Sequence, residues 1–347
     1  MAANDRLIFS LAHVAFQADG SASTSPSGVH GVQNVQINTT YGREDVFELG
    51  QLKACGTKET IPAITVSVEK YLDGKPLVYH SATTSTTGAD LWQRAANMKP
   101  AILKFATFDQ QLLAASGTPL AVCTCSGLYI DSLNYSFPLN GVMSETVAFV
   151  GSSKIWATGS SAANFFTGQF ASGYFGGPAG PDSCSPERRD NLDMVNSVWP
   201  QDIPEITGGG VNSDLGVKYK VHLGDISIAA NIARTELFEQ GRRRAFFRNP
   251  QSPIEITTTI GLTANEFMDA FNARDDGTTN LTNRTIKIRT SGGVQFDMGS
   301  SNQVQSVNFQ NVDVGGNPFG VQFVYTNRNG DLTVTSPSSD PKGYAYT

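Results

Sequence analysis

The stretch VQINTTYGREDVFELG, residues 35–50, decides the fold because the chain repeats it as ISIAANIARTELFEQG at residues 226–241. Aligned without a gap, the two stretches share five residues. These are Ile37/Ile228, Arg43/Arg234, Phe47/Phe238, Glu48/Glu239 and Gly50/Gly241. In both copies an alternating apolar pattern leads into a charged segment that closes on glycine. This pattern predicts a strand followed by a turn.

A second pair of similar blocks follows in the same order. SLNYSFPLNGVMSETVAFV spans residues 132–150, and SVNFQNVDVGGNPFGVQFV spans residues 306–324. A gapless alignment pairs Ser132, Asn134, Gly141, Val147, Phe149 and Val150 with Ser306, Asn308, Gly315, Val321, Phe323 and Val324. Two blocks in the same order indicate a tandem duplication. We therefore expect a first domain over 1–156, a linking segment over 157–215 and a second domain over 216–347.

The composition indicates β structure and argues against several classes of function. The chain has 347 residues, of which 16% are charged, and its net charge is −6. There is no basic excess of the kind that static nucleic-acid binding requires. No stretch approaches the roughly 20 apolar residues that span a bilayer, so we expect no membrane anchor.

Strands and turns dominate the pattern along the chain. Alternating apolar and polar residues predict half-buried strands over 64–72, 253–262, 285–290 and 321–326. Each half also carries one helix candidate, at 89–98 and at 264–275. The expected fold is mainly β: a barrel or sandwich with one flanking helix in each of two tandem domains.

The linking segment is rich in glycine and proline and also in aromatic residues. Exposed aromatic side chains need a surface to cover them, and long irregular segments are often functional. We interpret 157–215 as an extended arm that packs on a neighbouring subunit. Its candidate contact residues are Phe165, Phe166, Phe170, Tyr174, Phe175 and Trp199.

The sequence contains no recognisable catalytic or metal-binding pattern. Four scattered histidines lack a ligand spacing, and the chain has neither a GxSxG elbow nor a GxxxxGK[ST] phosphate loop. The four cysteines lack zinc spacing, and Cys123 and Cys125 share one face of a predicted strand as small buried residues. We expect no enzyme activity, no cofactor and no metal.

Charged residues near the repeated turns are candidate assembly contacts. Arg43 with Glu48, and Arg234 with Glu239, recur in both copies and suggest either a structural ion pair or an inter-domain contact. The motif GRRRAFFRNP at 241–250 adds Arg242, Arg243 and Arg244. Three interpretations of this motif stay open: ion pairing between subunits, plain surface, or nucleic-acid contact.

The order of these motifs resembles the phage tail tube protein family. The segments are GREDVFELG, then a proline-led alternating strand (IPAITVSVEKYL or SPIEITTTIGL), a helix, and the closing LNYSFPLNGVMSETVAFVGSSKIW. The resemblance covers roughly 30–156 and 217–330. It implies the tube-domain fold shared with the type VI secretion tube protein, here duplicated.

The resemblance implies a structural virion protein that is assembled in the host cytoplasm and located in the phage tail. Its subunits would form stacked rings, either of three chains with pseudo-six-fold symmetry or of six chains. DNA would pass through the lumen transiently and without sequence specificity. Further partners would be other tail proteins, such as a sheath, a tape measure or a baseplate.

Two other functions stay open. One is a single-ring tail component, such as a baseplate hub or a tube-end protein. The other is a two-domain β-sandwich that serves as a binding module or adhesin.

Overall fold

The computed structural model describes most of the predicted strands. The described residues are 12–18, 27–50, 52–59, 61–74, 77–83, 91, 100–108, 119–158, 186–194, 221–241, 245–264, 285–290, 292–310 and 320–335. Antiparallel strands make up nearly all of this structure, and the predicted mainly-β class is confirmed. Within the described residues the strands form open sheets and no closed barrel.

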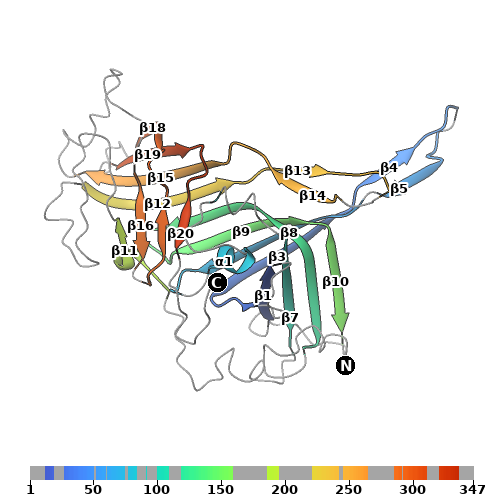
Figure 1. Cartoon of the computed structure of the whole chain (residues 1–347), viewed down its shortest axis with the longest axis horizontal. Helices are drawn as coiled ribbons and strands as arrows, with labels where there is room; N and C mark the ends of the chain where they lie inside the picture. Colours follow the sequence, from blue (N-terminus) through green and yellow to red (C-terminus); the bar gives the residue numbers. More distant parts are fainter. Residues whose placement is uncertain are drawn as a thin grey trace.

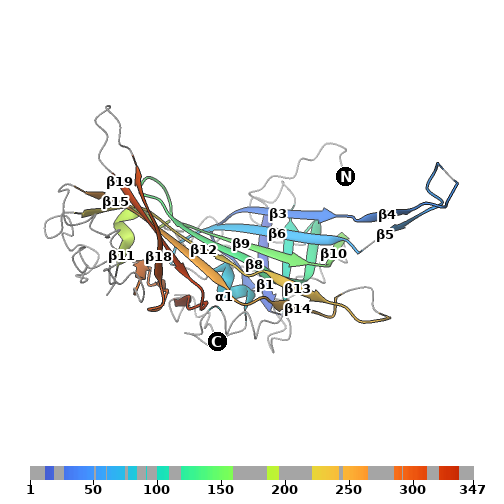
Figure 2. The same ribbon diagram turned by 90° about the horizontal axis from the view of Figure 1, so that it is seen from above.

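The largest sheet has twelve strands, and eight of them pair side by side in one layer, which can be followed in Figures 1 and 2. Their order is β3-β6-β9-β8-β12-β15-β19-β18, and each pairs antiparallel with its neighbour. The first four are β3 (Val32–Thr40), β6 (Ala63–Tyr71), β9 (Ser144–Gly151) and β8 (Ala121–Phe137). The last four are β12 (Val221–Asn231), β15 (Glu255–Ala264), β19 (Gly320–Asn327) and β18 (Gln303–Gln310).

A second layer of strands runs across each half of this sheet (Figure 1). In the first half the second layer includes the N-terminal part of β8, which pairs with β7 and β10, while β1 pairs with β7 and with β2. In the second half the order is β11-β16-β17-β20. The bounds are β1 Ala12–Ala18, β2 Ser27–Gly28, β7 Ala101–Thr107, β10 Ser153–Thr158, β11 Leu192–Met194, β16 Lys287–Thr290, β17 Gln295–Asp297 and β20 Thr333–Thr335. A short 3₁₀ helix, η2 (Arg189–Asn191), precedes β11.

The two halves share their topology strand by strand. The order β3-β6-β9-β8 recurs as β12-β15-β19-β18, and β1-β7-β8-β10 recurs as β11-β16-β17-β20. Even the β-bulges coincide: the ladder skips Asp131 in β8 and the equivalent Gln305 in β18. A bulge bends a strand and leaves one residue unpaired, so its recurrence at one position is a specific mark of duplication.

The register corrects part of the gapless sequence alignment. In the structure Ser132 and Ser306 occupy equivalent places, as predicted, and their partners are Ala148 and Val324. The alignment had paired Val324 with Val150, so the predicted equivalences in the second strand of this block are wrong by two residues. The reason is that a shift of two residues leaves the alternation of a strand unchanged, so the apolar pattern alone could not detect it.

The apolar core is continuous across both halves. Phe296 of β17 packs against Tyr135 and Phe137 of β8, with ring centroids 4.6 and 5.3 Å apart. In the first half Phe16 of β1 packs against Phe149 of β9 at 5.2 Å. The second layer of one half thus covers a strand that belongs to the other half, and the two repeats fold against each other.

Both predicted helices lie almost entirely outside the described residues, and one short helix was not predicted. Of the predicted helix 89–98 only Leu91 is described, and nearly all of 264–275 lies outside the described residues. The helix α1 (Val78–Ala82) was not predicted, because VYHSA has neither an N-cap residue nor helical periodicity. Within the predicted arm, residues 186–194 are described, and β11 pairs with β16 of the same chain.

A buried carboxylate holds α1 against the sheet. Glu145 of β9 accepts hydrogen bonds from the backbone N–H groups of Val78 and Tyr79, at 2.7 and 3.2 Å, and from the Tyr135 hydroxyl at 3.2 Å. Burial raises the pKa of Glu145 to about 7, although these hydrogen bonds and Lys70 favour the charged form. The folded chain therefore binds a proton at Glu145 in a pH range where the unfolded chain has lost it.

This shift predicts a pH-dependent stability that depends on Glu145. The folded-state pKa lies above the unfolded value, so the stabilisation is present below about pH 4.5 and is lost as the pH rises through about 7. Across this pH range the contribution of Glu145 to the free energy of unfolding changes by on the order of 3 kcal/mol. Glu145→Gln should flatten the change in urea midpoint between pH 5 and pH 8. Glu69→Gln, on the polar face of β6, is the control and should retain the wild-type change; equal slopes in all three proteins would contradict the prediction.

Candidate assembly surface

One face of the eight-stranded sheet is polar and almost without charge. Along most of these strands buried apolar residues alternate with serine, threonine, asparagine and glutamine on the opposite face, which also includes Val150 and Val324. Among the described strand residues of this face, Asp225, Glu69 and Glu255 are acidic and none is basic. Members of this face from the first half include Gln36, Asn38, Thr40, Thr65, Ser67, Ser132, Asn134, Ser136 and Thr146. Members from the second half include Ser227, Asn231, Thr257, Thr259, Ser306, Asn308 and Gln322.

The sheet ends in two edge strands. In the described structure β3 pairs only with β6, and β18 pairs only with β19. An edge strand presents a row of backbone donors and acceptors that another strand can pair with. By topology β3 is the copy of β12, and β18 is the copy of the C-terminal part of β8.

Between the two repeats, the corresponding edges are already joined. Six residue pairs connect β8 to β12, from Ile226 opposite Phe137 to Asn231 opposite Ser132. The chain therefore contains one complete example of how a β8-type edge meets a β12-type edge. We call this junction the internal seam.

Arg234 crosses the internal seam. Its Nε donates to the Ile130 carbonyl at 2.8 Å, its guanidinium carbon lies 5.1 Å from the centre of the Tyr129 ring, and its Nη1 donates to the Arg248 carbonyl at 3.1 Å. Burial lowers the pKa of Arg234 to about 10, while Tyr129 and Asp131 favour the charged form. Of the two predicted roles, the geometry of Arg234 corresponds to an inter-domain contact.

Arg43, the counterpart of Arg234, has a different environment. It lies 3.7 Å from Glu59, and both side chains are largely exposed, at 68% and 74%. An ion pair this exposed contributes little to stability. Glu48 and Glu239 lie beyond the ends of β4 and β13, and both are exposed.

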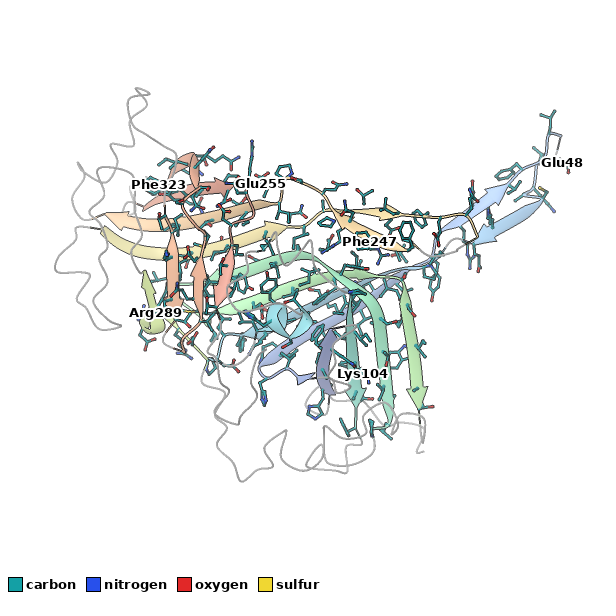
Figure 3. The ribbon with its side chains drawn as sticks, in the orientation of Figure 1. Glu48, Lys104, Phe247, Glu255, Arg289 and Phe323 are labelled. Atoms are coloured by element: carbon teal, nitrogen blue, oxygen red, sulfur yellow. The ribbon has the colours of Figure 1, made fainter. Side chains whose placement is uncertain are left out.

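Two β-hairpins extend from the same end of the sheet (Figures 1 and 2). The first hairpin is β4 (Arg43–Val46) with β5 (Gly56–Glu59), and the second is β13 (Arg234–Leu237) with β14 (Phe247–Pro250). Figure 3 places Glu48 at the far end of the first hairpin and Phe247 on the second. Exposed apolar side chains gather on both; they are Val46, Phe47, Leu49, Leu52, Leu237, Phe238 and Phe246.

A groove of about 430 Å³ lies between the base of the first hairpin and the second hairpin. Lys58, Glu59 and Pro62 line it from the first repeat, and Phe238 and Arg248 line it from the second. The groove therefore combines apolar surface with charges of both signs.

The remaining predicted contacts lie outside the described residues. These are Arg242, Arg243 and Arg244 of the arginine motif and the arm residues Phe165, Phe166, Phe170, Tyr174, Phe175 and Trp199. They stay predictions.

Two residues of the seam region were missed by the sequence analysis. Arg248, the last arginine of the GRRRAFFRNP motif, forms an ion pair with Glu236 at 2.7 Å and was not among the candidates. Its signal was present, since it lies opposite Glu236 in the hairpin that the repeated turn predicts. Tyr129 carried no sequence signal, because its place under Arg234 depends on the pairing of β8 with β12.

The described residues contain no group of histidine, cysteine, aspartate and glutamate that could hold a metal ion. Nor does any helix in this part of the chain have the length and apolarity needed to cross a membrane. Cys123 and Cys125 are buried neighbours with sulfur atoms 3.9 Å apart.

Comparison with known proteins gives matches at the level of structure only. No protein-family model and no curated protein sequence matches the chain. The solved structure of the SPP1 tail tube matches with a TM-score of 0.33 and 11% identity, over 55% of this chain and 91% of that one. The baseplate of the anti-feeding prophage, a six-fold symmetrised structure, matches with a TM-score of 0.28 and 10% identity, over 46% and 96%.

The internal seam predicts unequal effects of the same substitution at Arg234 and Arg43. Arg234→Lys should lower the free energy of unfolding of the unassembled chain by about 1–3 kcal/mol, because a lysine cannot reproduce the two directed hydrogen bonds. Arg43→Lys should change it by less than about 0.5 kcal/mol. Urea denaturation at a concentration where the chain is monomeric measures both, and equal losses would contradict the role assigned to Arg234.

Proposed function

We propose that this chain is the tail tube subunit of a tailed phage, a structural protein without catalytic activity. The observation that carries the proposal is the relation between the edges of its sheet. The edges left open at β3 and β18 are copies of the two edges that already pair at the internal seam. A chain with such edges can join its own copies head to tail.

Head-to-tail joining of identical chains generates a closed ring if the rotation per copy divides a full turn. Since each chain carries two repeats, three chains would give a ring of six similar units with pseudo-six-fold symmetry. Six chains would give a wider ring of twelve units. In either ring every edge strand of the sheet is paired, which removes a surface that otherwise promotes aggregation.

The polar face supports a role as a conduit. If the eight-stranded sheets join with this face inward, serine, threonine and asparagine side chains line the lumen together with Glu69 and Glu255. A lining without described basic side chains offers the phosphate backbone no partner, so DNA can pass without being retained. DNA is then a transient occupant and is not recognised by its sequence.

The hairpins support stacking of such rings. Leu49 and Leu52 are fully exposed at the end of the first hairpin, and exposed apolar clusters mark contact surfaces. Because both hairpins leave the sheet at one end, each ring would present its apolar tips to the next. Tail proteins such as a sheath, a tape measure or a baseplate would meet the finished tube.

The first test is assembly of the purified chain. Negative-stain electron microscopy should show hollow rods with a regular axial repeat, and end views should show three-fold or six-fold symmetry. Mass measurement of small assemblies by light scattering distinguishes three chains from six. Isolated rings that never stack would instead indicate a hub or tube-end component, and a monomer at all concentrations would oppose the proposal.

The second test separates ring formation from stacking. Leu49→Ser with Leu52→Ser removes apolar surface from the first hairpin without touching a sheet edge. We expect rings of normal mass but few or no rods in electron micrographs. The matched control is Leu139→Ser, an exposed leucine in the turn between β8 and β9. Loss of rings in the double variant, or normal rods, would contradict this role of the hairpin.

A further inference from the structure

The internal seam is held by more than the ladder between β8 and β12. The β8 bulge at Asp131 presents two carbonyl groups to the second repeat. The Ile130 carbonyl accepts from Nε of Arg234 at 2.8 Å, and the Asp131 carbonyl accepts from the backbone N–H of Ile232 at 2.7 Å. A bulged residue is left out of its own ladder, so its polar groups are available to another segment.

The open edge at β18 carries the same bulge. There the ladder passes from Val304 to Ser306 and skips Gln305, as it passes from Ile130 to Ser132 in β8. Val304 and Gln305 are therefore the counterparts of Ile130 and Asp131. On the other open edge, Tyr41 and Arg43 follow β3 as Ile232 and Arg234 follow β12.

The local partner of Arg43 differs from that of Arg234 in one informative way. In the first hairpin Arg43 lies opposite Glu59, whereas in the second Arg234 lies opposite Pro250. Proline offers no charge, and Arg234 instead reaches the first repeat. Glu59 offers an exposed carboxylate, and Arg43 lies 3.7 Å from it.

We propose that Arg43 is the intersubunit counterpart of Arg234 and exchanges Glu59 for the Val304 carbonyl of a neighbouring copy of this chain. This inference rests on the proposed ring. It assigns Arg43 as the residue that positions β3 of one subunit on β18 of the next. A second hydrogen bond, from the Tyr41 backbone N–H to the Gln305 carbonyl, follows from the same correspondence.

We call the proposed junction of β3 of one subunit with β18 of the next the intersubunit seam. The internal seam predicts its register. Ala229 opposite Asn134 and Asn231 opposite Ser132 translate into Asn38 opposite Asn308 and Thr40 opposite Ser306. This register places Asn38 and Asn308, both exposed, on the polar face, and it places Ile37 on the core side. A slip by one residue would reverse both faces, so the register is strongly specified.

The intersubunit seam should be the weaker of the two. The counterpart of Tyr129, whose ring lies near Arg234, is Gln303, and the counterpart of Asp131 is Gln305. The neighbouring copy therefore offers Arg43 neither an aromatic ring nor a carboxylate at these positions. Glu59 competes for Arg43 in the free chain, which further favours an interface that forms only above a threshold concentration.

The first experiment compares two substitutions that remove the same charge from the same hairpin. Arg43→Met should raise the concentration at half-assembly, measured by light scattering or sedimentation, at least about tenfold. Lys58→Met, the matched control on β5, should leave it within about twofold. Glu59→Gln should lower it, because Arg43 then has no competing carboxylate. A purely local role of the Arg43–Glu59 pair predicts instead that both Arg43→Met and Glu59→Gln act on the monomer and leave assembly unchanged.

The second experiment tests the register by disulfide formation in a Cys55→Ser background. Asn38→Cys with Asn308→Cys should give covalent dimers and larger ladders on non-reducing gels after mild oxidation, because directly opposite residues lie within disulfide reach. The internal pair Ala229→Cys with Asn134→Cys should give no intermolecular product. Asn38→Cys with Ser306→Cys tests a two-residue slip and should cross-link less.

The outcomes separate the inference from the proposed function. If the wild-type chain never forms rings, both the proposed function and this inference are contradicted. Wild-type rings in which Arg43→Met assembles normally, or in which the Asn38–Ser306 pair cross-links better than the Asn38–Asn308 pair, overturn the inference and leave the proposed function standing. If the concentration at half-assembly is raised for Arg43→Met and the Asn38–Asn308 pair cross-links as predicted, both the inference and the proposed function are supported.

Discussion

The structure depends on one constraint: a β-strand at the edge of a sheet must find a partner for its backbone hydrogen-bonding groups. Inside the chain β8 and β12 satisfy this constraint for each other, and the pairing turns two four-stranded sheets into one of eight strands. The same constraint acts at β3 and β18, for which the described chain offers no second partner. Each repeat thus leaves one open edge in the eight-stranded sheet, a β12-type edge at β3 and a β8-type edge at β18.

Packing reinforces this pairing and explains why the repeats do not behave as separate globules. Phe296 lies in the second layer of the second repeat, yet its ring packs on Tyr135 and Phe137 of the first. Glu187 adds a polar link, since its backbone bonds to Leu72 and Met143 while its carboxylate accepts from the Gly292 N–H at 2.6 Å. Both core and polar contacts therefore support the internal seam. A seam that lacks one of these supports can be reversible.

The class of fold could be predicted from the sequence because alternation is a local signal, and the predicted duplication is supported by the recurring strand order. The sequence also predicted equivalent positions for Arg43 and Arg234, but in a turn, whereas each begins a hairpin strand, β4 or β13. It could not assign different partners to them, since those partners depend on which strand lies alongside. The two-residue error between Val150 and Val324 has a similar origin: strand periodicity is unchanged by a shift of two, and only the pairing with Ala148 and its counterpart reveals the register. The three-residue strand β11 was hidden for a third reason, because LDM within a glycine- and proline-rich segment is too short to show alternation.

Arg234 and Arg43 recur at equivalent positions but have different surroundings. Arg234 is half-buried and opposite a proline, and it donates hydrogen bonds to the Ile130 carbonyl of the first repeat and to the Arg248 carbonyl of its own hairpin. Arg43 is the same residue type, but it lies opposite Glu59, and on the proposed partner strand Gln303 occupies the position that corresponds to Tyr129. These are changes of the surroundings and not of the arginine itself. In the proposed ring, the same strand, bulge and side chain would form both the joint within a chain and the joint between chains, and Glu59 in place of Pro250 and Gln303 in place of Tyr129 would make the second joint the weaker.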